Sequence, residues 1–166
     1  MYTSIDQFQK DWKYESDATL KVLDNLTDES LKQKITPDGR SLGFLAWHLI
    51  HTIPEMMGKT GLKIEGPTEN SEIPKSATEI KDTYKNTSNF FSELVNRSWK
   101  DETLNIEDDL YGERWKRGIT LSALILHQAH HRGQMTVLMR QAGLKVPGIY
   151  GPSKEEWEAM GMKPLD

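Results

Sequence analysis

The chain has 166 residues, of which 36% are hydrophobic and 28% are charged, and its net charge is −4. With no cysteine, disulfides, thiolate metal ligands and a cysteine nucleophile are excluded, so a bound metal would need nitrogen or oxygen ligands. The slight excess of acidic residues argues against a nucleic-acid-binding surface.

Most of the chain shows the spacing of apolar residues that is typical of α-helices. The first helix is expected to start at Ser4, because Ser4 and Gln7 can form a capping box. Its apolar positions follow at helical spacing: Ile5, Phe8, Trp12, Thr19, Val22, Leu23 and Leu26. The sequence TPDG at residues 36–39 then predicts a turn.

A second helix is expected from near Ser41. One of its faces carries Leu42, Leu45, Leu49, Thr52 and Met56. Pro54 is expected to kink or end this helix, because proline removes a backbone hydrogen bond. Residues 58–75 are rich in Gly, Pro, Asn and Ser and predict a long surface connection. Such a connection is typical of two helices that run in the same direction and need a crossover.

The third helix is expected to start at Ser76, with Glu79 as its capping partner. Its inner face is formed by Ile80, Tyr84, Thr87, Phe91, Leu94 and Val95. Residues 101–118 are polar and irregular, and the alternation at Leu104 and Ile106 predicts a short hairpin there.

The fourth helix is expected to have Thr120 as its N-cap, residues 121–141 as its body and Gly143 as its stop. A short last helix is expected from Ser153 through Met160. The sequence therefore predicts an all-α four-helix bundle with a long crossover and a short C-terminal helix, forming one domain over residues 1–166.

The expected location is the cytoplasm. Residues 1–7 lack the basic and apolar regions of a signal peptide. The most apolar stretch, residues 42–57, is interrupted by polar side chains and is too short to span a bilayer. We therefore expect no membrane partner and no nucleic-acid partner.

All five histidines lie in two of the expected helices: His48 and His51 in the second, and His127, His130 and His131 in the fourth. At about 100° per residue, His127 and His131 lie about 40° apart on one helical face. They are about 6 Å apart along the helix axis. Such an i, i+4 pair can bind one divalent metal ion.

His48 borders the apolar face of the second helix and is therefore the expected third ligand, whereas His51 and His130 point further from the core. Three imidazoles would leave coordination positions open for water or substrate, as in catalytic metal sites. A single core histidine is more often structural, and that interpretation applies to His48 taken alone. Burying both His127 and His131 without partners would be costly, which favours a metal for this pair.

Three segments resemble the DinB-like (YfiT-like) superfamily of metal-binding four-helix bundles. The sequence LHQAHHRGQM at residues 126–135 resembles the signature helix of the superfamily. The sequence LAWHL at residues 45–49 resembles its second-helix motif, and VPGIYGPSKEEW at residues 146–157 is similar to tails in this group. The fourth helix is the most specific of the three.

The resemblance implies a metal held by His48, His127 and His131, which the helical geometry also selects. It further implies a homodimer and a hydrolase or low-molecular-weight-thiol S-transferase acting on a small-molecule substrate. It assigns no definite role to His130 or Arg132. Zinc, nickel, iron and cobalt all suit three imidazoles and water.

Glu55 is a candidate general base, since it follows His48 by seven residues and lies about 20° away on the helical wheel. The simpler interpretation is a solvated carboxylate at a helix end. Gln134 points near the direction of His127 and His131, and either orients a ligand or bonds to a neighbouring helix.

Three functions are compatible with these patterns. The first is a metal-dependent enzyme, and the second is a non-catalytic metal-binding module of a stress response. The third is a metal-free domain that binds a partner through the expected exposed aromatic residues Trp115, Tyr150 and Trp157.

Overall fold

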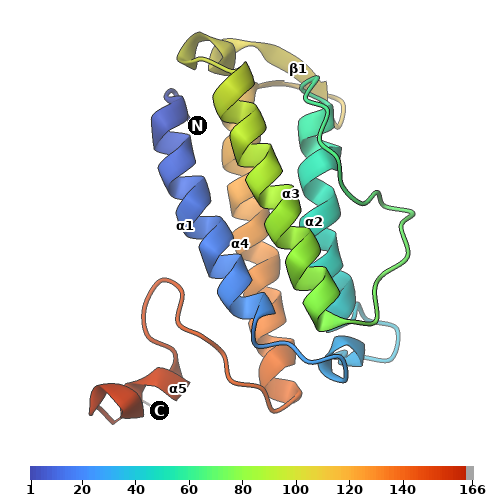
Figure 1. Ribbon diagram of the computed structural model, residues 1–166, viewed down its shortest axis with the longest axis vertical. Helices are drawn as coiled ribbons and strands as arrows, with labels where there is room; N and C mark the ends of the chain where they lie inside the picture. The colour runs from blue at the N-terminus through green and yellow to red at the C-terminus, as the bar shows by residue number, and fades with distance from the viewer. Residues whose placement is uncertain (164–166) are drawn as a thin grey trace.

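Four long helices lie side by side in the computed structural model, which describes residues 1–163 (Figure 1). They are α1 (Ile5–Leu23), α2 (Leu42–Gly58), α3 (Ala77–Ser98) and α4 (Arg117–Gln141). The strands β1 (Glu107–Leu110) and β2 (Glu113–Lys116) form an antiparallel hairpin at one end of the bundle. The short helix α5 (Lys154–Trp157) and three 3-10 turns (Ser30–Lys32, Asp101–Asn105 and Glu158–Met160) complete the structure. The expected all-α four-helix bundle is confirmed.

The connection between α2 and α3 crosses the length of the bundle. Residues 59–76 lead from the hairpin end of α2 to the opposite end, where α3 begins (Figure 1). The helices α2 and α3 therefore run in the same direction, while α1 and α4 run in the other. The long crossover that the sequence predicts is thus present.

Serine side chains start the first three helices. The Oγ atoms of Ser4, Ser41 and Ser76 each accept a hydrogen bond from the backbone N–H three residues further on. This contact satisfies one of the backbone donors that a helix start leaves free. After the end of α4, Gly143 has a φ of +73°, the left-handed conformation that favours glycine at this position.

The start of α4 differs from the prediction. The helix begins at Arg117, and Thr120 lies inside its first turn rather than at the N-cap. The reason is that β2 leads directly into the helix through Lys116, whose side chain makes no capping hydrogen bond. The Thr120 hydroxyl instead donates to the Lys116 carbonyl.

The hairpin is present, but its strands begin after Leu104 and Ile106, the residues from which it was predicted. Leu104 lies in a 3-10 turn and Ile106 precedes β1. The turn occurs at Tyr111 and Gly112, which both have positive φ values, 54° and 86°. Two successive residues with positive φ are typical of the tight turns that match the twist of a β-hairpin.

Pro54 does not end α2, which continues to Gly58. Proline removes only one hydrogen bond here, close to the end of the helix. The neighbouring residues Ile53, Met56 and Met57 are buried in the core, so packing holds this last turn in place.

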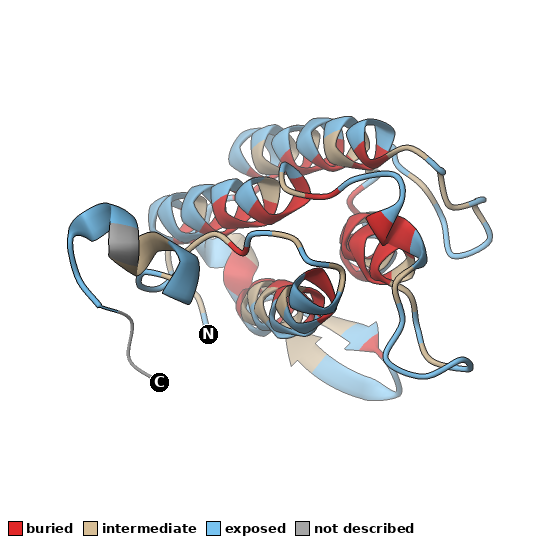
Figure 2. Ribbon diagram, turned by 90° about the horizontal axis from the view of Figure 1, so that it is seen from below, coloured by how far each residue is buried: buried red, intermediate tan, exposed pale blue. Residues whose placement is uncertain are grey.

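The core lies between the helices, and their buried faces point inward (Figure 2). Near the start of α1, Phe8 and Trp12 pack edge-to-face against Phe91 of α3. No helix among residues 1–163 is long and apolar enough to cross a membrane.

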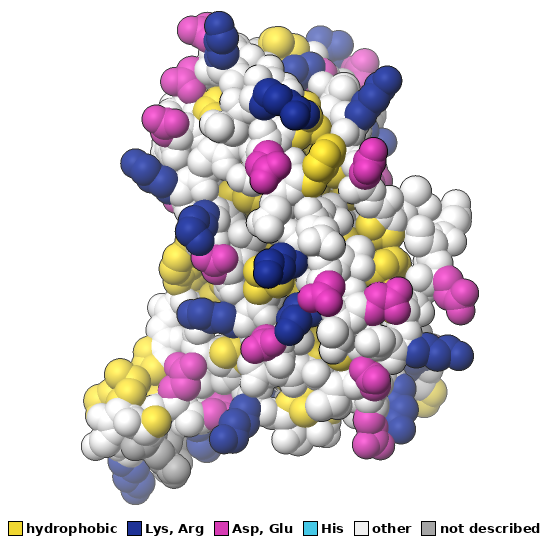
Figure 3. Space-filling model, in the orientation of Figure 1, with side chains coloured by type: hydrophobic (Ala, Val, Ile, Leu, Met, Phe, Trp, Pro, Cys, Tyr) yellow, Lys and Arg dark blue, Asp and Glu magenta, His cyan; other side chains and the backbone are white. Residues whose placement is uncertain are grey.

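The surface formed by α1 and α3 mixes charges of both signs, and no histidine is visible on it (Figure 3).

Of the three aromatic residues that the sequence analysis expects to be exposed, only Tyr150 is exposed. The prediction is wrong for Trp115 and Trp157, which are half-buried. The Trp115 indole N–H donates to the Glu113 carboxylate.

Candidate metal centre

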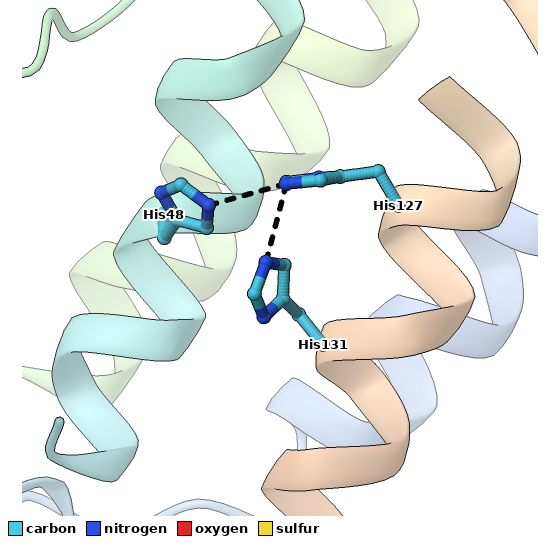
Figure 4. A group of neighbouring side chains, drawn as sticks. All are labelled: His48, His127 and His131. Carbon is cyan, nitrogen blue, oxygen red and sulfur yellow. Dashed lines mark hydrogen bonds between the residues drawn. The ribbon is translucent and has the colours of Figure 1, made fainter. Parts of the chain in front are cut away.

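Three imidazoles meet between α2 and α4. His48 projects from α2, and His127 and His131 project from α4 toward it (Figure 4). The Nε2 atom of His127 lies 3.2 Å from the Nε2 atoms of both His48 and His131. The three ligand atoms lie within 4.8 Å of one another. The structure thus brings together the three residues that the sequence selects.

A buried glutamine fixes α2 and α4 in this register. Gln128, which is fully buried, donates from Nε2 to the carbonyl of Leu49 over 2.8 Å. Its Oε1 accepts a hydrogen bond from the Tyr84 hydroxyl of α3. Because Gln128 follows His127 and Leu49 follows His48, this contact holds the two imidazoles opposite each other.

The outer nitrogen of His131 shows which tautomer the ring adopts. Its Nδ1 lies 2.7 Å from the amide oxygen of Gln134, which can only accept a hydrogen bond. The Nδ1 atom therefore carries the proton, and the Nε2 lone pair faces the cluster. The amide nitrogen of Gln134 lies 3.1 Å from Nε2 of the exposed His130, which accepts its hydrogen bond in this arrangement.

The outer nitrogen of His48 also has a partner. Its Nδ1 lies 3.0 Å from Nε2 of His51, and the two rings are in edge contact. His51 is therefore closer to the cluster than its direction on the helix predicts. The Nδ1 atoms of His51 and His127 are buried and have no hydrogen-bond partner among the described residues.

The geometry fits a divalent metal ion. Tetrahedral zinc with bonds of about 2.0–2.1 Å to imidazole nitrogen would separate its ligand nitrogens by about 3.3 Å. Two of the three separations, both 3.2 Å, match this spacing, and all three ligand atoms lie within 4.8 Å of one another. A single N–H of His127 can donate to only one of its two neighbours, whereas one cation would bind all three nitrogens.

The imidazoles are in the neutral form that binds metals. Burial lowers the pKa of His48 to about 3, and positive charge on the neighbouring histidines lowers it further. Burial likewise lowers the pKa of His127 to about 4 and reduces that of His131. At neutral pH all three lone pairs are therefore available.

Glu55, the candidate base, is not one of the three grouped ligands. Its carboxylate accepts a hydrogen bond of 2.7 Å from the Tyr111 hydroxyl and lies 3.5 Å from Nζ of Lys59. Its charge opposes the lowering of the His127 pKa that burial causes. The turn of the hairpin thus orients this carboxylate through Tyr111.

Arg132, to which the sequence assigns no role, is buried directly after His131. Its guanidinium forms an ion pair with Glu15 of α1 and donates to the Thr19 hydroxyl. The Tyr150 hydroxyl of the C-terminal segment joins this network. Arg132 therefore attaches α4 and the C-terminal segment to α1 rather than lining the cluster.

Comparison with known proteins gives relatives over nearly the full length. A Bacillus subtilis (strain 168) protein described as the uncharacterized protein YrdA is 48% identical over 163 residues, which cover 98% of each chain. The crystal structure of a DinB-like protein from Bacillus cereus ATCC 10987 is 48% identical, with a TM-score of 0.88 over 90% of this chain and 100% of that one.

A second solved structure has the same fold at lower identity. The DinB-like protein YjoA from Bacillus subtilis is 16% identical, with a TM-score of 0.69 over 89% of this chain and 99% of that one. The family model of the DinB family matches residues 1–164. The chain therefore belongs to the DinB family.

Proposed function

We propose that the chain is a cytoplasmic metal-dependent enzyme that acts on a small-molecule substrate, with His48, His127 and His131 as the metal ligands. The observation that supports this proposal is the convergence of three Nε2 atoms from two helices. Three protein ligands leave a coordination position for water or substrate, as catalytic sites require.

The proposed reaction class is hydrolysis or S-transfer from a low-molecular-weight thiol. Zinc, nickel, iron or cobalt would act as a Lewis acid and lower the pKa of a bound water or thiol. Within the chain, Gln134 keeps the proton on Nδ1 of His131, and His51 orients the ring of His48. Glu55 is the candidate acceptor for the proton that the nucleophile loses, and the Tyr111 hydroxyl orients it.

Metal binding is tested first, by titrating the purified chain with Co²⁺ and Zn²⁺. We expect one metal ion per chain and a Co²⁺ absorption spectrum of nitrogen coordination. His131→Ala should weaken binding by more than the roughly 10- to 100-fold expected for an outer-sphere change. His130→Ala is the matched control, because this histidine on the same helix is exposed, and it should keep the metal.

Turnover is then measured with p-nitrophenyl acetate, and with cysteine plus monochlorobimane. In the second reaction the thiol loses its proton, sulfur bonds to the methylene carbon and chloride leaves. Turnover that needs the metal and is lost in folded His131→Ala supports the enzyme. Metal binding without turnover, together with a large fall in Tm on chelation, would instead identify a non-catalytic metal-binding module. Failure to bind any metal would leave a partner-binding domain.

A further inference from the structure

A cavity of about 420 Å³, open to the surface, lies between α4, the first turn of α2 and the segment that precedes α2. This volume is in the range of small-molecule sites, about 300–1,000 Å³. Its walls are mainly apolar and include Ile35, Leu45, Val137 and Leu138. Three polar side chains also line it, Thr36, Arg40 and Gln134.

Two of these polar residues, Arg40 and Gln134, connect the cavity to the proposed metal ligands. The amide oxygen of Gln134 accepts the hydrogen bond from Nδ1 of His131. The guanidinium carbon of Arg40 lies 4.9 Å from the ring centre of Phe44. The Phe44 ring is stacked on the imidazole of His48, with ring centres 5.8 Å apart and an angle of 13° between the planes. A molecule in the cavity would therefore contact Gln134, which bonds to His131, and Arg40, which stacks on the Phe44 ring beside His48.

The guanidinium of Arg40 has no carboxylate partner among the described side chains. Among the same side chains Arg97 has no such partner either, whereas Arg114, Arg117, Arg132 and Arg140 each form an ion pair. Its stacking on Phe44 positions the cation at the cavity while leaving its N–H donors available. Arginine donors match the geometry of a carboxylate and can bind it through two parallel hydrogen bonds.

We propose that this cavity binds the non-reacting part of the substrate, and that this part is an aliphatic chain ending in a carboxylate. The carboxylate pairs with Arg40, the methylene groups pack against Val137 and Leu138, and the other end of the molecule reaches the metal. Arg40 is then a specificity-determining residue. This inference rests on the proposed function, because it assigns the reacting end of the substrate to the metal.

The test compares two thiols that differ only in their far ends, 6-mercaptohexanoate and 6-mercaptohexan-1-ol, on the Co²⁺-loaded full chain. Their thiolates give a sulfur-to-cobalt charge-transfer band that reports binding. We expect the carboxylate to bind roughly tenfold more tightly than the alcohol, as for one partly exposed charge-assisted pair. Arg40→Gln should abolish this preference and leave the affinity for the alcohol unchanged.

Arg114→Gln is the matched control, since Arg114 is an exposed arginine on the hairpin, and it should keep the preference. Equal affinities of the wild-type chain for the two thiols, or an undiminished preference in Arg40→Gln, would overturn the proposal.

A second arm separates this inference from the proposed function. Hexanoate and hexan-1-ol are added to the metal-free chain, and the methyl resonances of Ile35, Val137 and Leu138 are followed by NMR. Hexanoate should shift these resonances in the wild type and not in Arg40→Gln. If Co²⁺ does not bind but hexanoate does, the cavity assignment stands and the metal enzyme does not. If hexanoate causes no shift, the cavity assignment fails.

Discussion

The ring of His131 is held from outside the cluster by Gln134, and the ring of His48 by His51. Such outer contacts fix the tautomer and the orientation of a metal-binding histidine. Gln134 is itself exposed, so its contribution can be removed without disturbing the core. It is therefore the most direct residue at which to measure the effect of the outer hydrogen bonds.

We expect Gln134→Ala to weaken zinc binding by roughly 10- to 100-fold, because Nδ1 of His131 loses its acceptor. Competition with a chromophoric chelator measures the affinity. Gln134→Glu keeps an acceptor oxygen and should retain most of the affinity. Gln141→Ala, an exposed glutamine at the end of the same helix, should bind zinc like the wild type. Equal affinities for all four chains would show that the contact does not support a metal ligand.

The sequence predicts the direction of His127, His131 and Gln134 because all three lie on one helix, where spacing determines direction. It does not predict the contact of His51 with His48, since the wheel places His51 further from the core. It also does not show that His48 faces His127. That depends on the axial register of α2 and α4, which the contact of Gln128 with the Leu49 carbonyl fixes.

At the level of elements, α1 and α4 are joined by a buried ion pair. Arg132 of α4 is 2% exposed, and Glu15 of α1 is 9% exposed. The guanidinium also donates to the Glu15 carbonyl over 3.1 Å and to the Thr19 hydroxyl over 3.0 Å. Because these contacts satisfy the buried charge, removal of one partner leaves the other charge buried and unpaired.

Glu15→Ala should therefore lower the free energy of unfolding by about 3–5 kcal/mol. Urea denaturation of the metal-free chain, followed by circular dichroism, measures the change. The matched control is Asp17→Ala, which removes the exposed ion pair with Lys13 on the same helix. That change should cost less than about 1 kcal/mol. Similar losses for the two variants would contradict a special role for the buried pair.

The starts of α1, α2 and α3 could be predicted because a capping serine is a local signal. The start of α4 could not, since its N-cap Lys116 makes no side-chain capping contact and belongs to β2. The hairpin was expected too early along the chain. Its position depends on the turn at Tyr111 and Gly112 rather than on the apolar residues before it.

On the scale of the whole molecule, the homodimer stays a prediction. The outward face of α4 offers a surface for it, because Ile119 and Leu126 are 38% and 69% exposed and lie seven residues, or two helical turns, apart. Exposed apolar side chains in line on one helix are typical of contacts between helices of two subunits.

Light scattering with size-exclusion chromatography should give the wild-type chain twice the mass of the 19.0 kDa monomer. Leu126→Glu should shift it toward the monomer, because the dimer would have to bury a charge. Ile106→Glu introduces the same charge at an exposed position outside α4 and should leave the mass unchanged. A wild-type chain that is already monomeric would exclude the dimer.

His48 and His127 are 79 residues apart in the chain, and the crossover, α3 and the hairpin all lie between them. During synthesis, α2 therefore leaves the ribosome with only one of the three proposed metal ligands, His48. The other two, His127 and His131, follow when α4 is synthesised. An incompletely folded chain presents at most the local pair His127 and His131, which would hold a metal only weakly. If the proposed metal binds, its tight binding would therefore require that α4 has docked against α2, and a chain arrested before that step would not bind it tightly.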